Sequence, residues 1–183
     1  METTEKIAFL YLRFNGFFLM PYFTVFGVEK GRHLDVLGIR LAGSEEKVGE
    51  NLLSRDEEFI NRLRGYEEDT ILWAEVGTGS RRDLFPERKE AYCKRIFGGK
   101  DQLKKVYFDF DKQQEDLVYK DGILIVPAGR CRKIILDRFS QMESEPVKNK
   151  LNEMTKTGSW KWSEDFLADL LCLRKTGFLK SNT

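Results

Sequence analysis

Apolar residues along this chain recur either at helical spacing or in short strand-like segments, and together these two patterns predict a mixed α/β domain. In residues 4–15, Ile7, Leu10, Tyr11 and Phe14 follow the i, i+3, i+4, i+7 spacing of one helix face. The predicted helices cover residues 4–15, 55–64, 86–97 and 134–142, and the predicted strands cover residues 17–26, 33–41, 71–76, 103–110 and 122–127. This order of elements is typical of an α/β or α+β fold in which helices flank a mixed sheet.

The predicted strand over residues 71–76 ends on an unexpected polar residue. Its first four residues are apolar without alternation, which indicates a strand covered on both faces. The strand ends on Glu75, just before a glycine-rich turn that begins at Gly77. Because a buried carboxylate without a partner is costly, Glu75 needs one. The candidate partner is Asp35, which lies in the predicted strand over residues 33–41.

The strands before this one are predicted to form a hairpin. Residues 17–26 and 33–41 are joined by a turn at 29–32, and Pro21 places the first strand at an edge of the sheet or kinks it. Residues 42–70 are polar and charged, so they are predicted to be an insertion that contains one short helix.

A chain of 183 residues is long enough to bury one core, and we expect two parts. The core domain is expected to cover residues 1–142. A helical C-terminal extension over residues 143–183 is expected to pack on this core, with helices near 146–155 and 163–175.

Composition and charge narrow the function classes. The net charge of +1 means that any surface for nucleic acid must be local. Cys93, Cys131 and Cys172 are widely spaced, so a zinc site is not expected, and their odd number indicates reduced thiols and a cytoplasmic location. No apolar run reaches the ~18 residues of a membrane span. The single histidine, His33, excludes chemistry that needs a histidine pair.

Asp35 and Glu75 are candidate ligands for a divalent cation such as Mg²⁺, which prefers oxygen ligands and needs only one or two carboxylates. Glu5, in the first predicted helix, is a third candidate. In the alternative without a metal, Asp35 forms an ion pair with Arg32 or Arg40, and Glu75 caps a turn. The spacing of these residues leaves both interpretations open.

The arrangement resembles the PD-(D/E)XK nuclease superfamily, which includes type II restriction enzymes and archaeal Holliday-junction resolvases. The matching residues are Glu5 in the helix, Asp35 in the strand pair and Glu75 in the third strand. Segments 10–18, 23–25, 35–40 and 74–79 resemble an uncharacterised bacterial group of this type, and the resemblance covers roughly residues 5 to 127. It implies a restriction-endonuclease-like core, Mg²⁺-dependent phosphodiester hydrolysis of DNA rather than RNA, and a homodimer.

The chain departs from the family at Gly77, where the family has the lysine of its Glu-x-Lys motif. Three explanations remain open. A basic residue from elsewhere replaces that lysine, the domain has lost catalysis and kept binding, or a metal site has no nuclease role. The candidate replacements are Arg81, Arg82, Lys89 and Lys94.

Basic residues cluster beside this site. Arg81 and Arg82 lie in the predicted loop, and Lys94 and Arg95 lie in the following predicted helix, where they are candidates for binding nucleic-acid phosphates. Acidic residues interleave with them, so an ordinary solvated helix face explains the same pattern.

Overall fold

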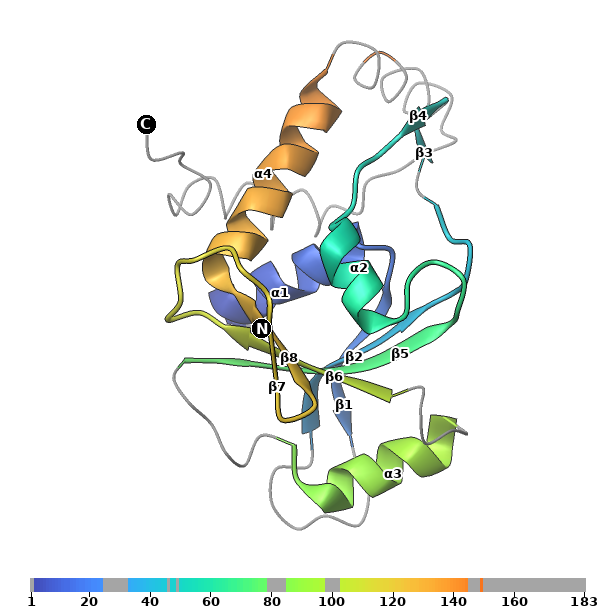
Figure 1. Ribbon diagram of the computed structural model, residues 1–183, viewed down its shortest axis with the longest axis vertical. Helices are drawn as coiled ribbons and strands as arrows, with labels where there is room; N and C mark the ends of the chain where they lie inside the picture. The colour runs from blue at the N-terminus through green and yellow to red at the C-terminus, as the bar shows by residue number, and fades with distance from the viewer. Residues whose placement is uncertain are drawn as a thin grey trace.

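The computed structural model describes residues 2–24, 33–45, 47–48, 50–78, 85–97, 103–144 and 149, and within them a mixed six-stranded sheet has helices on both faces (Figure 1). The helices are α1 (Thr3–Phe14), α2 (Glu57–Leu63), α3 (Glu87–Phe97) and α4 (Ala128–Glu143). The strands of the sheet are β1 (Phe18–Thr24), β2 (His33–Arg40), β5 (Thr70–Gly77), β6 (Leu103–Asp109), β7 (Val118–Lys120) and β8 (Ile123–Pro127). Strands β3 (Lys47–Val48) and β4 (Asn51–Leu52) form a separate ribbon. The predicted class, a mixed sheet flanked by helices, is confirmed.

The strands lie in the order β1-β2-β5-β6-β8-β7 across the sheet. β2 is antiparallel to both of its neighbours, β1 and β5, whereas β5, β6 and β8 run parallel to one another. β7 is antiparallel to β8. β5 lies inside the sheet, and its residues from Thr70 to Val76 are all buried. Burial on both faces explains why this strand reads as a continuous apolar run.

The hairpin of β1 and β2 is confirmed, with Phe18 paired to Ile39 at one end. β1 is an edge strand of the sheet, as Pro21 predicts. Its backbone is distorted at Tyr22, which has φ of +52°, in the left-handed region that non-glycine residues rarely adopt. The predicted turn over 29–32 lies outside the described residues.

Each face of the sheet has its own core. On one face, α1, α2 and α4 cover the sheet, and Tyr11 makes edge-to-face contacts with Phe59 at 5.1 Å and Phe108 at 5.7 Å. On the other face lies α3 (Figure 1), and its Cys93 belongs to the same core cluster as Trp73.

Several elements differ from the predictions. Residues 42–70 were predicted to hold one short helix only, but they also contain the two-residue strands β3 and β4. Strand β7 was not predicted because its three residues are exposed and too few to show a period. Helix α4 begins at Ala128, six residues before the predicted helix over 134–142. Its first turn contains Gly129, where an added Cβ would lie 1.9 Å from the carbonyl oxygen of Gln113. This close approach of two backbones requires glycine inside a helix, where its propensity is poor.

The predicted C-terminal extension, with helices near 146–155 and 163–175, lies outside the described residues except for 143–144 and 149. In the described part of the chain, none of the helices combines the length and the apolar character that crossing a bilayer requires.

Asp56 joins three of the helices on one face. It caps α2 by accepting from the N–H of Phe59 at 3.0 Å, and it accepts a 2.5 Å hydrogen bond from the hydroxyl of Tyr11 in α1. Arg130 of α4 donates two hydrogen bonds to the same carboxylate, at 2.7 and 2.5 Å. Burial opposes ionisation of Asp56, but the hydrogen bonds from Arg130, Tyr11 and Phe59 outweigh it and lower the pKa. The carboxylate is therefore a charged junction of α1, α2 and α4.

Replacement of Asp56 by alanine should destabilise the protein strongly. The change removes the buried partner of Arg130, which keeps only Glu58 and the carbonyl of Glu115. It also leaves the buried hydroxyl of Tyr11 without its acceptor and removes a helix cap, so the free energy of unfolding should fall by about 2–4 kcal/mol. Urea unfolding measures this loss. The control is Glu115→Ala, which breaks an exposed ion pair with Lys133 and should cost about 0–1 kcal/mol. Equal losses in the two variants would contradict the assigned role of Asp56.

Candidate active site

Asp35 and Glu75 lie side by side on neighbouring strands. The antiparallel register of β2 and β5 pairs Val36 with Ala74, which sets Asp35 opposite Glu75. Side chains alternate between the faces of a strand, and Trp73, two residues before Glu75, belongs to the core beneath α3. Both carboxyl groups therefore lie on the α3 face of the sheet. Glu75 is 6% exposed, and Asp35 is partly buried.

Each carboxyl group accepts a hydrogen bond from β5. The backbone N–H of Val76 donates to Asp35 Oδ2 at 2.8 Å. The indole Nε1–H of Trp73 donates to Glu75 Oε1 at 2.6 Å. These two bonds fix one oxygen of each carboxyl group.

The alternative in which Asp35 forms an ion pair with Arg40 is wrong. Arg40 is fully buried and donates to the carbonyl of Gly65 and, at 3.3 Å, to Thr70 Oγ1. Arg32, the other partner considered, lies outside the described residues.

The pKa of Glu75 is raised to about 8. Burial is the largest cause, and the negative charge of Asp35 is the second. The hydrogen bond from Trp73 and the positive charge of Lys89 oppose the shift, while a hydrogen bond with Asp35 adds to it. Two carboxyl groups this close do not both ionise readily, so the pair holds one proton at neutral pH.

Lys89 brings an ammonium group to this pair from α3. Its Nζ lies 4.0 Å from Glu75 Oε1 and donates to the carbonyl of His33 at 2.8 Å. The same nitrogen lies 5.9 Å from the ring centroid of Trp73. Lys89 is 7% exposed, an unusual degree of burial for a lysine. The structure thus brings one of the four candidate replacement residues next to Glu75.

The packing of α3 explains why this lysine, and not Lys94, reaches the pair. Lys89 and the buried Cys93 are four residues apart and share one face of the helix, which is turned toward the sheet. Lys94 forms an ion pair with Glu90 instead, and Glu90 also binds Lys105 of β6.

Glu5 does not join the pair. Its carboxylate accepts a 2.5 Å hydrogen bond from the hydroxyl of Tyr22, which raises the pKa of Tyr22 to about 12, and it accepts from the N–H of Glu2 at the start of α1. Within the described residues, no group of three or more histidine, cysteine, aspartate or glutamate side chains could hold a metal ion. The ring of His33 contacts Thr24 Oγ1 at 3.2 Å, and only its carbonyl faces Lys89.

The candidate phosphate-binding residues divide into two sets. Arg81 and Arg82 lie outside the described residues. Lys94 is partly buried beside Glu90, and the exposed Arg95 stacks its guanidinium over the ring of Tyr92 at 5.4 Å. Both of the described residues belong to α3, the helix that carries Lys89.

Trp73 is a site residue that the sequence analysis missed. It is fully buried, it donates to Glu75, and its ring meets that of Phe85 edge-to-face at 4.8 Å. The signal was present in the spacing, because residues i and i+2 of a strand lie on one face. Trp73 therefore orients the carboxyl group of Glu75.

Comparisons of the chain with protein-family models, curated proteins and solved structures found no match. A carboxyl pair that repels a second negative charge suits a divalent cation, and a nearby ammonium suits an anionic substrate group.

Stability should fall with rising pH because of Glu75. Its folded-state pKa is raised to about 8, so between its ordinary pKa of 4.5 and about 8 the folded protein holds a proton that the unfolded chain has lost. The free energy of unfolding should therefore decrease across this window, by about 1 kcal/mol or more. Glu75→Gln, which is neutral throughout, should remove most of this decrease.

Urea unfolding at about pH 5, 6.5 and 8 measures this slope. The control Glu87→Gln replaces an exposed glutamate at the start of α3 and should keep the wild-type slope. A Glu75→Gln protein whose stability falls as steeply as wild type would show that the proton is not held at Glu75.

Proposed function

We propose that this protein is a metal-dependent phosphodiesterase of the nuclease type, with a PD-(D/E)XK core in which Lys89 replaces the missing motif lysine. The observation that carries the proposal is the ammonium of Lys89, 4.0 Å from Glu75 and on the same face of the sheet as Asp35. The order of α1, a strand pair with Asp35, β5 with Glu75, then α3 and β6 agrees with the order that the resemblance implies.

Asp35 and Glu75 would hold the metal, because two carboxylates with substrate phosphate and water satisfy Mg²⁺. The raised pKa of Glu75 supports this fit, since a cation would relieve the repulsion that now favours protonation. When bound, the metal supplies Lewis-acid polarisation of the phosphoryl group and acidifies water.

The other residues of the site have distinct roles in this proposal. Lys89 keeps a positive charge where negative charge develops on the phosphate, which is the stabilisation that preorganised cations give. Trp73 orients the carboxyl group of Glu75 by donating its indole N–H to Oε1. Gly77 contributes no side chain, so the lysine reaches the site from α3 rather than from β5.

The proposed substrate is nucleic acid, and DNA rather than RNA. Lys94 and Arg95 on α3, with Arg81 and Arg82 in the preceding segment, are the proposed phosphate contacts. A homodimer is proposed by analogy, since cutting two strands requires two sites.

A second function, an inactive binding or protein-interaction domain, is favoured by a different observation. Asp35 and Glu75 each accept a hydrogen bond within the sheet, and Lys89 donates to His33. These bonds hold the site together without a metal. In a nuclease fold that has lost catalysis, such hydrogen bonds would take the place of the metal ion in stabilising the carboxyl groups.

Substitutions at the pair and at Lys89 separate the two functions. Asp35→Asn should abolish Mn²⁺ binding measured by calorimetry and abolish cleavage of DNA. Lys89→Met should keep metal binding and lower the cleavage rate by about 10²-fold or more, since it removes a charge and not a ligand. The control Lys133→Met, on α4 and paired with Glu115, should cleave like wild type.

Absence of metal binding by the wild-type chain at millimolar Mn²⁺ would overturn the proposed enzyme. DNA binding without cleavage by the wild-type chain would establish the inactive alternative. Unchanged cleavage by Lys89→Met would remove this lysine from the mechanism.

Metal affinity should also rise with pH. The cation must displace the proton of the carboxyl pair, so the Mn²⁺ dissociation constant should decrease by up to about tenfold per pH unit until about pH 8, the pKa of Glu75. Calorimetry in buffers of different ionisation enthalpy counts the released proton. Affinity that is flat over this range would contradict a protonated pair.

A further inference from the structure

A cavity of about 540 Å³ opens at the start of β1, on the side of the molecule that carries α1. Its lining includes three phenylalanines, two arginines and one glutamate, which are Phe9, Phe17, Phe18, Arg13, Arg55 and Glu45. The volume lies within the ~300–1,000 Å³ of small-molecule sites. None of these residues belongs to the site of Asp35 and Glu75.

Arg55 is built into the wall of this cavity. It is 9% exposed and donates to the carbonyl of Ser44. Its guanidinium rests on Gly16, where an added Cβ would lie 2.9 Å from Cζ and where φ is +83°. A guanidinium has five N–H groups, so donors remain for an anion. The position of Arg55 therefore depends on a glycine.

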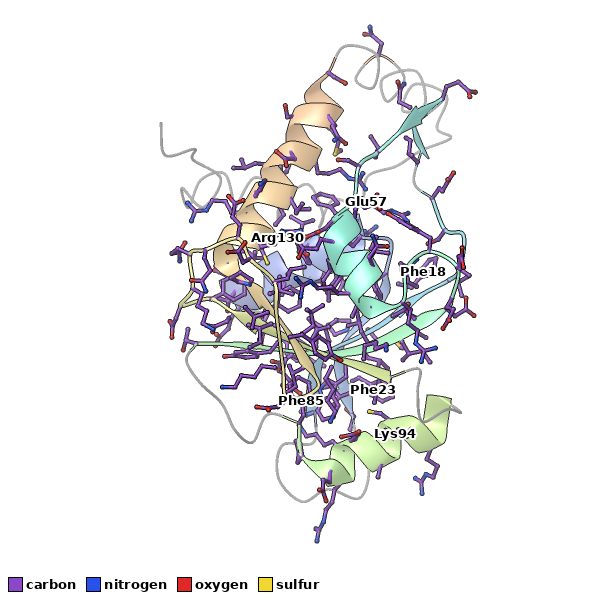
Figure 2. All side chains as sticks on the ribbon, viewed as in Figure 1. Phe18, Phe23, Glu57, Phe85, Lys94 and Arg130 are labelled. Carbon is purple, nitrogen blue, oxygen red and sulfur yellow. The ribbon has the colours of Figure 1, made fainter. Side chains whose placement is uncertain are left out.

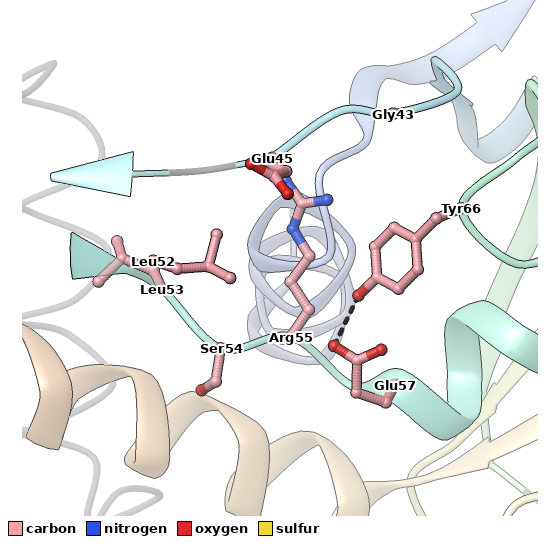
Figure 3. A pocket seen from close by; sticks show the side chains of 8 residues that line it. All are labelled: Gly43, Glu45, Leu52, Leu53, Ser54, Arg55, Glu57 and Tyr66. Atoms are coloured by element: carbon pink, nitrogen blue, oxygen red, sulfur yellow. Dashed lines mark hydrogen bonds between the residues drawn. The ribbon is translucent and has the colours of Figure 1, made fainter. Parts of the chain in front are cut away.

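The same arginine lines a smaller cavity of about 230 Å³. Figure 3 shows the side chain of Arg55 between Leu52 on one side and the hydrogen-bonded pair of Tyr66 and Glu57 on the other, with its guanidinium directed toward Glu45. The two cavities thus share Arg55 and Glu45.

The larger cavity is lined by two arginines and one glutamate, and a third arginine lies behind it. Arg40 is fully buried behind their walls, with its guanidinium 5.9 Å from the ring centroid of Phe17 and 5.5 Å from that of Tyr66. Its Nε and Nη1 have no hydrogen-bond partner among the described residues. Burial lowers the pKa of Arg40, and the charge of Arg55 lowers it further. An anion in the cavity would relieve this repulsion.

The aromatic lining suits a planar group. Phe18, labelled in Figure 2, is 70% exposed, whereas the preceding residue, Phe17, is buried. An exposed phenylalanine at a cavity with cationic walls is the surface on which nucleic-acid bases stack. The exposed carboxylate of Glu45 is an acceptor for hydroxyl or amino groups.

We propose that this cavity binds a nucleoside phosphate. The phosphate binds Arg55 and Arg13, the base stacks on Phe18, and Glu45 accepts from the sugar hydroxyls or the base. A free nucleotide and the phosphorylated end of a single strand offer the same chemistry. Binding in this cavity needs neither a metal nor catalysis, so it is independent of the proposed phosphodiesterase activity.

Calorimetry of the full chain with adenosine monophosphate, in the presence of EDTA, tests the site. Adenosine and inorganic phosphate should each bind at least about tenfold more weakly than the nucleotide. Arg55→Met should weaken nucleotide binding by about tenfold or more, and Phe18→Ser by about fivefold or more.

Matched controls are available on the same elements. Arg62→Met removes an exposed arginine of α2 that pairs with Glu58, and Met20→Ser shortens a half-exposed side chain of β1 outside the cavity; both should bind like wild type. If Arg55→Met does not fold, Phe18→Ser still decides, because its side chain contributes little to the core.

Binding of a phosphorylated oligothymidylate distinguishes the two sources of the ligand, a free nucleotide and the end of a single strand. If the natural ligand is a strand end, the oligonucleotide should bind at least about tenfold tighter than adenosine monophosphate. Phe18→Ser should then weaken the binding of both ligands by the same factor. A free nucleotide predicts the reverse order of affinity. No binding of either ligand at millimolar concentration would overturn the proposal, as would phosphate that binds as tightly as the nucleotide.

Discussion

The candidate site depends on one physical constraint, the burial of two carboxyl groups side by side on β2 and β5. Two buried negative charges repel each other, so the protein must supply a proton, a cation or hydrogen-bond donors. It supplies donors from Val76 and Trp73, and it places the ammonium of Lys89 within 4.0 Å of Glu75. The raised pKa of Glu75 indicates that these donors compensate for the burial only in part. Under the proposed function, the remaining repulsion would favour binding of a divalent cation.

Sequence patterns predicted the carboxyl pair because strands have a short, regular period. A continuous apolar run that ends on Glu75 and a second apolar strand with Asp35 are local features, and adjacency of the strands follows once both are in one sheet. The same reasoning could not exclude Glu5. The apolar stripe of α1 fixes which face of that helix is buried, but not where Glu5 lies relative to the opposite face of the sheet.

The sequence could not show which basic side chain lies next to Glu75, for a different reason. Four basic residues after β5 were equivalent in composition, and the choice among them depends on how α3 docks. Cys93 is buried against the sheet, and this sets Lys89, one turn earlier, toward Glu75 and leaves Lys94 to Glu90. The start of α4 at Ala128 was missed for a similar reason. The close approach that requires glycine at position 129 comes from Gln113, a residue that is distant in sequence.

In the proposed enzyme, a lysine on the helix instead of the strand changes what the site depends on. A lysine at position 77 would be fixed by β5 itself, whose register with β2 and β6 is rigid. Lys89 is instead fixed by the docking of α3, which rests on the small core of Trp73, Cys93 and their neighbours. A helix held by few contacts opens at lower free energy than a central strand. The carboxyl pair is therefore permanent in this fold, whereas the ammonium is present only when α3 is docked, and a ligand that bridges the two would hold the helix in place.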